Sequence, residues 1–580
     1  MSFDSRDLHL VPPPKSISTS DSYSDLSAFN YRNLRPTREQ QQDLPAAVSL
    51  IKETSKAFPD QGYRLNISKS QVEVRASTVY GWHCGLQTLK QIATASKDHL
   101  PVLQIEDHPD FEHRGIMLDV SRNKVPKLET LYYLIDLFSS WKINELQLYI
   151  EHAFAYEGHE TVWEHASPLT REDIHNLDTY CSERFIELVP NLNCFGHMSL
   201  WLVRESYNHL AEQPDGGNTD LGYREVPQGL CPVDPGSIKL AEDLIRQMTS
   251  CFQSNRINVG CDETIDLGYG RSKEAVESRG RGAVYLDYLK QVHAICESQG
   301  KRMQFWADII LRYPELLDEV PANGTALNWG YESIHPFEKE TELLGSSETE
   351  FYVCPGTSSW NSLGGRTENM LGNIQTAARC GVKNGAVGFM VTDWGDNGHL
   401  QPLVSSFPGF IYASSQAWHQ DAAIELAPCL DTYVFKAQGW GDLILALGDL
   451  DKPLDVYIHN QSALFKILHE DEQAIRNLEG LEPKLLETAL SQALSSRATL
   501  SQLAAEHPTD SILAQECRWV SEMLIHACKR GLSILNGEPV EPLVDEATRL
   551  RSEHKVIWHE RNRSGGYRDS RKFFDRLIDR

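Results

Sequence analysis

Short apolar runs recur between residues 113 and 394, and longer amphipathic or polar segments separate them. The runs are 113–120, 144–150, 185–193, 256–263, 303–308, 325–331, 351–357 and 385–394. Intervening stretches such as Leu128 to Trp141 and Ala283 to Gly300 have helical periodicity. Parallel strands that are buried on both faces read as near-continuous apolar runs, so the alternation predicts an α/β fold, specifically a (β/α)8 barrel over residues 110–425.

The first hundred residues carry a different pattern. Tyr63 to Ser68 and Val72 to Ala76 alternate apolar and polar side chains around a Lys-Ser turn, which predicts a β-hairpin. A helical stretch to about Ala95 and an extended Leu100 to Ile105 follow. The segment predicts a small α+β domain over residues 1–109, closed by a proline-containing turn.

The carboxy-terminal part of the chain is leucine-rich at helical spacing. Leu464 to Glu506 and Ile512 to Leu535 contain few glycines or prolines, so residues 426–580 are predicted to form a helical region. The last thirty residues, Arg551 to Arg580, carry nine Lys or Arg and five Asp or Glu. We interpret them as a solvated helix packed on an acidic body rather than as a binding tail.

Composition and charge exclude some classes of partner. The 55 Lys and Arg against 81 Asp and Glu give a net charge of −26, which disfavours nucleic acid and anionic membrane surfaces as partners. No run approaches the roughly 18 apolar residues of a membrane span. The segment Met1 to Ser16 lacks a signal-peptide pattern, and the 12 cysteines form no Cys-x-x-Cys pair. These features predict reduced, buried thiols and a cytoplasmic protein.

Polar and aromatic residues follow the predicted strands where a (β/α)8 barrel carries its active site. Strand two ends at Glu151-His152, and strand three leads through Asn191 and Asn193 to His197. Strands five, six and eight end at Trp306-Ala307-Asp308, Trp329-Gly330-Tyr331 and Trp394-Gly395-Asp396. Aromatic faces stack on sugar C–H groups and carboxylates accept from hydroxyls, so the pattern predicts a sugar pocket. The alternative is that these tryptophans only fill the core.

Asp262-Glu263 is the strongest single feature. Neighbouring side chains on a strand point in opposite directions, so both reach one ligand only if the strand ends there. Such a pair is poorly placed to face each other at the roughly 5 Å of a retaining glycosidase. It suits a division in which the substrate's 2-acetamido oxygen is the nucleophile, one carboxylate orients it, and one carboxyl protonates the leaving group. The dipeptide alone is equally compatible with a helix-capping turn.

These residues resemble the glycoside hydrolase family 20 β-N-acetylhexosaminidases. The matching motifs are His113-Arg114-Gly115-Ile116-Met117-Leu118-Asp119 with Ser121-Arg122, Phe195-Gly196-His197, Gly260-Cys261-Asp262-Glu263 and Trp394-Gly395-Asp396. The segment Tyr80 to Leu89 resembles the helix of that family's non-catalytic α+β domain. Ile150-Glu151 and Asn193 to Met198 look most like the intracellular hexosaminidase D branch, which favours β-linked N-acetylgalactosamine.

The resemblance implies an exo-acting, retaining β-N-acetylhexosaminidase that uses substrate-assisted catalysis with no metal or cofactor. Asp262 would orient the acetamido group and stabilise an oxazolinium intermediate, and Glu263 would be general acid and then general base. Arg114 would hold the outer hydroxyls, as suits a planar guanidinium. The substrate-binding residues implied are Arg114, Glu151, His197, Trp306, Trp329, Trp360, Trp394 and Asp396.

The sequence departs from the family pattern at several positions, and it leaves alternative functions open. The chain departs from secreted members at Glu151-His152, Asn191 and Asn193, and its strand seven offers only Tyr352, Trp360 and Asn361 as contacts for the acetamido oxygen. One alternative is a catalytically silent N-acetylhexosamine-binding barrel. Another is a metal-dependent hydrolase using His152, His197 and Asp262, which the absence of a spaced histidine pair disfavours. The sequence does not fix the preference between N-acetylgalactosamine and N-acetylglucosamine, the aglycone or the oligomeric state.

Overall fold

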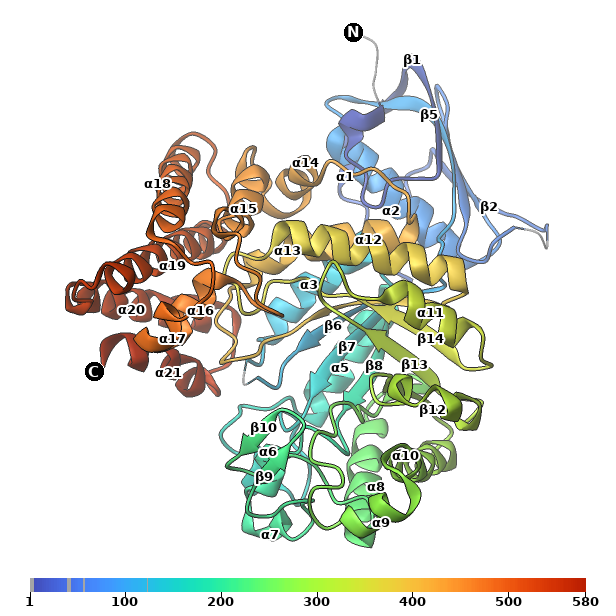
Figure 1. The fold of residues 1–580 in the computed structure, drawn as a ribbon. Helices are drawn as coiled ribbons and strands as arrows, with labels where there is room; N and C mark the ends of the chain where they lie inside the picture. The colour runs from blue at the N-terminus through green and yellow to red at the C-terminus, as the bar shows by residue number, and fades with distance from the viewer. Residues whose placement is uncertain (1–4, 39–42, 56–57, 123, 580) are drawn as a thin grey trace.

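A closed barrel of eight parallel strands forms the centre of the molecule (Figure 1). The computed structural model describes residues 5–38, 43–55, 58–122 and 124–579, so the first four residues of the amino-terminal segment lie outside the described residues. The barrel strands are β6 (His113–Asp119), β7 (Glu145–Ile150), β8 (Glu187–Leu192), β11 (Arg256–Asn258), β12 (Arg302–Trp306), β13 (Thr325–Trp329), β14 (Glu350–Cys354) and β15 (Gly388–Asp393). The predicted (β/α)8 barrel is confirmed.

Helices cover the outside of the barrel and connect its strands. They are α3 (Leu128–Ser140), α5 (Arg171–Glu183), α8 (Pro235–Thr249), α10 (Arg281–Ser298), α11 (Phe337–Gly345), α12 (Thr367–Asn384) and α13 (Phe407–Trp418). The crossover from β12 to β13 differs, because it contains only the 3-10 turns η3 (Ile310–Arg312) and η4 (Pro314–Glu319). Pro314 begins the second of these turns, where its missing N–H costs nothing.

The amino-terminal sheet stands at one end of the molecule, in blue at the top of Figure 1. Its order is β1-β5-β3-β4-β2, with α2 (Val79–Ala95) packed against it. The strands are β1 (Ser16–Ser27), β2 (Val48–Lys52), β3 (Tyr63–Ile67), β4 (Val72–Ala76) and β5 (His99–Asp107). The expected hairpin is the antiparallel pair β3 and β4. The edge strands β1 and β2 have no clear apolar pattern in the sequence, because most of their side chains are exposed or half-buried.

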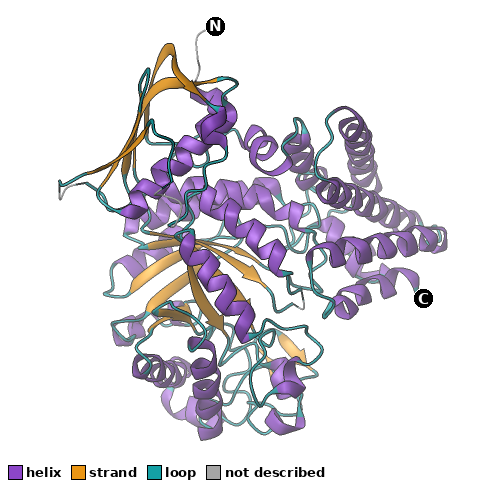
Figure 2. Cartoon of the chain, turned by 180° about the vertical axis from the view of Figure 1, so that it is seen from behind, coloured by secondary structure: helices purple, strands orange, loops and turns teal. Residues whose placement is uncertain are grey.

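The carboxy-terminal region is built of helices, as predicted, and lies beside the barrel (Figures 1 and 2). Its helices are α14 (Leu426–Leu430), α15 (Trp440–Gly448), α16 (Ala463–His469), α17 (Glu472–Arg476), α18 (Pro483–Glu506), α19 (Ser511–Asn536), α20 (Val544–Arg561) and α21 (Tyr567–Ile578). In the basic last segment, Phe573, Phe574 and Leu577 of α21 are buried. No helix within the described ranges is both long and apolar enough to cross a membrane.

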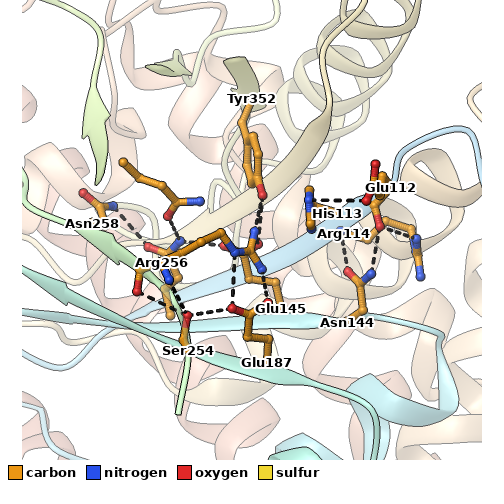
Figure 3. A network of polar contacts seen from close by, with 12 residues as sticks. Glu112, His113, Arg114, Asn144, Glu145, Glu187, Ser254, Arg256, Asn258 and Tyr352 are labelled. Carbon is orange, nitrogen blue, oxygen red and sulfur yellow. Dashed lines mark hydrogen bonds and ion pairs between the residues drawn. The ribbon is translucent and has the colours of Figure 1, made fainter. Parts of the chain in front are cut away.

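The amino-terminal half of the barrel interior is charged rather than apolar (Figure 3). Arg256 of β11 donates to Glu145 Oε2 at 2.7 Å, to the Tyr352 hydroxyl at 2.5 Å, and forms an ion pair with Glu187. Glu145 is completely buried. Barrel layers normally favour Val, Ile and Leu, so this layer depends on complete pairing of its charges.

A ring of amides lies directly above this ion layer. Gln147 donates from Nε2 to Gln304 Oε1 at 2.8 Å, and its Oε1 accepts from Asn191 at 2.9 Å and Asn258 at 3.1 Å. Asn191 therefore belongs to the barrel interior. On the other side of this ring, toward the carboxyl ends of the strands, the Tyr149 and Trp306 rings both pack against Trp394.

We predict that Arg256→Met lowers the free energy of unfolding by about 3–5 kcal/mol, because it leaves Glu145 buried without its cation. Arg302→Met is the matched control, since Arg302 and Glu350 form an ion pair about half exposed to solvent, and it should cost less than about 1 kcal/mol. Urea unfolding of both variants measures the difference. Equal, small losses would show that the ion layer does not stabilise the barrel.

Candidate active site

The turn after β11 directs two adjacent carboxyl groups toward the same mouth of the barrel. The sequence predicts a strand over residues 256–263, but β11 ends at Asn258, so the carboxyl pair lies in the turn after the strand. Gly260, Cys261 and Glu263 have φ values of +71°, +66° and +45°, so the backbone coils in the left-handed region. A Cβ on Gly260 would lie 2.0 Å from Asn193 Oδ1, which requires glycine here. Left-handed non-glycine residues are strained and concentrate at functional sites.

A second loop packs directly on this turn. A Cβ on Gly196 would lie 2.2 Å from the Asp262 carbonyl oxygen, so the Phe195-Gly196-His197 motif brings two backbones into contact. His197 itself has φ +54°. The glycine of this motif therefore sets the distance between the His197 loop and the carboxylate turn.

His197 lies among three carboxyl groups. Its Nε2 is 3.3 Å from Asp262 Oδ2 and 3.4 Å from Glu263 Oε2, and its Nδ1 is 3.7 Å from Glu151 Oε1. Burial alone would lower the pKa of His197, but the Asp262 and Glu151 carboxylates raise it to about 9. At neutral pH His197 is therefore an imidazolium, and its positive charge lies within ion-pair distance of all three carboxyl groups.

Glu263 is placed for proton transfer. Burial raises its pKa above the ordinary value, and the Asp262 carboxylate adds to the rise while His197 opposes it. Its side chain is 41% exposed, whereas that of Asp262 is 8% exposed. A reachable carboxyl with a raised pKa is suited to general acid catalysis, and a buried neighbour is suited to charge stabilisation.

Arg122, which follows the carboxyl end of β6, places its guanidinium group at the mouth of the barrel. Its Nη1 is 3.3 Å from Asp119 Oδ2 and 3.4 Å from Glu151 Oε1. Its Nε is 3.8 Å from Asp396 Oδ1. Its Cζ is 5.1 Å from the centre of the Trp394 ring. Because three acids from different strands converge on it, Arg122 holds the carboxyl ends of β6, β7 and β15 together.

The expectation that Arg114 contacts a sugar is corrected by its position. Arg114 is the second residue of β6, at the amino end of the strand, and is completely buried. Its guanidinium donates to the Lys142 carbonyl at 3.0 Å, the Gln61 amide oxygen at 2.7 Å and the Tyr80 hydroxyl at 3.0 Å. It therefore joins the amino-terminal domain to the bottom of the barrel.

The predicted tryptophans do converge. Trp306 and Trp394 lie with ring centres 6.0 Å apart, and Trp394 Nε1 donates to the Tyr331 hydroxyl at 2.8 Å. Tyr331 stacks on Trp329 at 5.1 Å and meets the Trp360 ring edge-on at 5.1 Å. The buried indole N–H groups of Trp306 and Trp329 have no protein acceptor among the described residues. Buried indole N–H groups usually find one, so these two are available to a ligand.

The strand-seven candidates separate in the structure. Tyr352 lies in the Arg256 layer and does not reach the mouth. Asn361 Nδ2 approaches Asp396 Oδ2 at 3.5 Å, and the Trp360 indole donates to Asn460 Oδ1 at 3.0 Å. Tyr331, two residues after the end of β13, is the tyrosine whose hydroxyl accepts from Trp394 and whose ring contacts Trp329 and Trp360. The sequence signal for it is its position two residues after Trp329.

The carboxy-terminal helices border the site. A cleft of about 380 Å³ runs from Arg122 and Glu151 to α21. Its remaining lining residues are Ser121, Leu200, Asn397, Gly398, His469, Asp569, Lys572, Phe573 and Arg576. Among the described residues no group of His, Cys, Asp and Glu is arranged to hold a metal ion.

Comparison with known proteins places the chain in a family. The catalytic-domain model of glycosyl hydrolase family 20 matches residues 111–377, and the model of domain 2 of that family matches residues 9–108. The two models describe adjoining domains and together match more than half of the chain. The chain therefore belongs to glycosyl hydrolase family 20.

Relatives and solved structures agree with this assignment. The β-hexosaminidase subunit beta of Entamoeba histolytica is 24% identical over 37% of this chain and 40% of its own length, and the β-hexosaminidase of Vibrio furnissii is 23% identical over 53% and 58%. The matched part is thus well under two thirds of each relative. The chitobiase of Flavobacterium johnsoniae has a TM-score of 0.61 at 14% identity, covering 99% of this chain and 100% of that one. The likeness to the chitobiase shows the shared fold.

We predict that the His197 ring titrates near pH 9, well above the ordinary value of 6.5, and that Asp262→Asn moves its pKa down. Because the folded-state pKa is raised, the stabilisation from His197 is fully present below pH 6.5 and is lost as the pH rises through about 9. NMR titration of the ring resonances measures both values. An unchanged titration in Asp262→Asn would contradict the contact.

Proposed function

We propose that the protein is an exo-acting, retaining β-N-acetylhexosaminidase that removes a terminal β-linked N-acetylhexosamine by substrate-assisted catalysis. The observation that carries the proposal is the pair Asp262 and Glu263, joined by the imidazolium of His197 beside an aromatic pocket. Two carboxyl groups on one turn cannot flank a glycosidic bond, so the nucleophile comes from the substrate.

Each step of the reaction has a group to perform it. The Glu263 carboxyl gives its proton to the glycosidic oxygen while the substrate's acetamido oxygen attacks the anomeric carbon and the glycosidic bond breaks. The Asp262 carboxylate accepts from the acetamido N–H and stabilises the positive oxazolinium ion. The Glu263 carboxylate then removes a proton from water, which attacks the same carbon from the opposite face and opens the oxazolinium ring, so configuration is retained.

The remaining site residues have binding roles in this proposal. Trp306, Trp329 and Trp394 enclose the acetamido group and the sugar face, and Trp360 supports this wall through Tyr331. Arg122 takes the role of holding the outer hydroxyls, with Glu151 and Asp396 as acceptors beside it. Tyr331 is our candidate for the hydroxyl that contacts the acetamido oxygen.

We propose further that the protein belongs to the hexosaminidase D branch, that it shares that branch's preference for N-acetylgalactosamine, and that it acts inside the cell. The motifs Ile150-Glu151 and Asn193 to Met198 support this, and N-acetylgalactosamine would then be the preferred sugar. The 12 cysteines are buried and free, which is the usual state in a reducing compartment such as the cytoplasm. Parallel assays on aryl β-N-acetylgalactosaminide and β-N-acetylglucosaminide test the preference.

We predict that Glu263→Gln and Asp262→Asn each lower turnover of aryl β-N-acetylhexosaminides by about 10²–10⁴-fold, because one loses the proton donor and the other the charge that stabilises the intermediate. Circular dichroism and the unfolding midpoint verify that both variants fold. Wild-type activity in either variant would contradict its role. A wild-type protein that binds N-acetylhexosamine without hydrolysis would instead support a silent sugar-binding barrel.

We predict that Arg122→Lys lowers kcat/KM by about 30–150-fold, because lysine loses the forked donors that suit vicinal hydroxyls. Arg114→Lys is the matched control: it should keep kcat/KM of the folded enzyme within about threefold and lower the unfolding free energy by about 1–3 kcal/mol. Steady-state kinetics and urea unfolding separate the two effects. A larger kinetic loss in Arg114→Lys would contradict the assignment.

A further inference from the structure

Asp308 contacts the backbone of the proposed acid from a neighbouring strand. It lies two residues beyond the end of β12, and its Oδ2 accepts a hydrogen bond from the Glu263 N–H at 3.2 Å. Its other oxygen, Oδ1, is buried without a hydrogen-bond partner among the described residues. Asp308 is thus a third carboxyl group beside Asp262 and Glu263.

The Glu263 backbone is tied at both of its peptide groups. Its N–H is held by Asp308, and its carbonyl oxygen accepts from the Ile265 N–H at 2.6 Å. Glu263 has φ +45°, a conformation that persists only when its surroundings fix it. The direction in which the Glu263 side chain leaves the turn therefore depends on the Asp308 contact.

The charge environment of Asp308 is dominated by acids. Asp262 and Glu263 face it from the turn after β11, Tyr285 from α10 and Arg312 from η3. Burial and the Asp262 charge raise the pKa of Asp308 well above its usual range. A neutral carboxyl still accepts the Glu263 N–H through its carbonyl oxygen.

We infer that Asp308 is a positioning residue for the general acid: its carboxyl group accepts the Glu263 N–H and thereby fixes the backbone from which the Glu263 side chain projects. Because its other oxygen is buried without a partner beside two further carboxyl groups, Asp308 is the member of this group that stays uncharged. This inference rests on the proposed role of Glu263. A charged Asp308 would place a second carboxylate next to the acid and weaken its ability to give up a proton.

Two substitutions separate the parts of this inference. Asp308→Asn keeps an oxygen acceptor and is permanently neutral, so kcat should stay within about threefold and the alkaline limb of the pH profile should move by less than about 0.3 pH unit. Asp308→Leu removes the acceptor. It should lower kcat/KM, which covers only the steps up to glycosidic cleavage, about 30-fold or more for a poorly leaving aglycone. For a dinitrophenyl aglycone, which needs no acid, kcat/KM should fall less than about threefold.

Asp266→Asn is the matched control, because Asp266 is a buried carboxyl of the same loop that accepts from the Gly229 N–H at 2.9 Å. It should leave the aglycone dependence unchanged. Asp308→Ala replaces the leucine variant if that variant does not fold.

Kinetics of these variants at several pH values, with both aglycones, test the inference. Equal losses of kcat/KM for the two aglycones in Asp308→Leu would overturn it, since a purely structural role lowers kcat/KM for both alike. A fall of the alkaline limb by one pH unit or more in Asp308→Asn would also overturn it, because Asp308 would then be ionised in the active enzyme. An inactive wild-type enzyme would instead overturn the proposed function, and this inference with it.

Discussion

The contact of the His197 imidazolium with Asp262 and Glu263 is the interaction on which the site depends. Two carboxyl groups on adjacent residues repel each other, and burial raises the cost of charging both. The His197 cation lies within 3.4 Å of both carboxyl groups and offsets this repulsion, while burial raises the pKa of Glu263. The left-handed conformations at His197, Cys261 and Glu263 are what bring the three groups together.

The barrel was predictable because its strands are buried on both faces and therefore stand out as apolar runs. The ends of the runs were harder to place. The run at 256–263 continues across Gly260, although the strand ends at Asn258, because apolar residues also pack the turn that follows. The edge strands β1 and β2 escaped prediction for the opposite reason: they bury few side chains.

Much of the candidate site could also be predicted, since Asp262, Glu263, His197 and the three tryptophans do lie together. Arg114 could not be separated from Arg122 by motif alone. The rule that active sites lie at carboxyl ends of strands favours Arg122, which follows β6, over Arg114, near its beginning. The sequence places Asp308 at the end of the strand-five run but assigns it no role, because its contact with the Glu263 backbone leaves no pattern in the sequence.

In the reaction that we propose, the acetamido oxygen of the substrate, and no protein group, attacks the anomeric carbon. The most direct measurement is kcat/KM for a series of aryl β-hexosaminides whose N-acyl group carries zero, one, two or three fluorine atoms. Fluorine withdraws electron density from the amide oxygen and weakens it as a nucleophile, so we predict a steep fall of kcat/KM along the series. A kcat/KM independent of fluorination would contradict it and point to a nucleophile supplied by the protein.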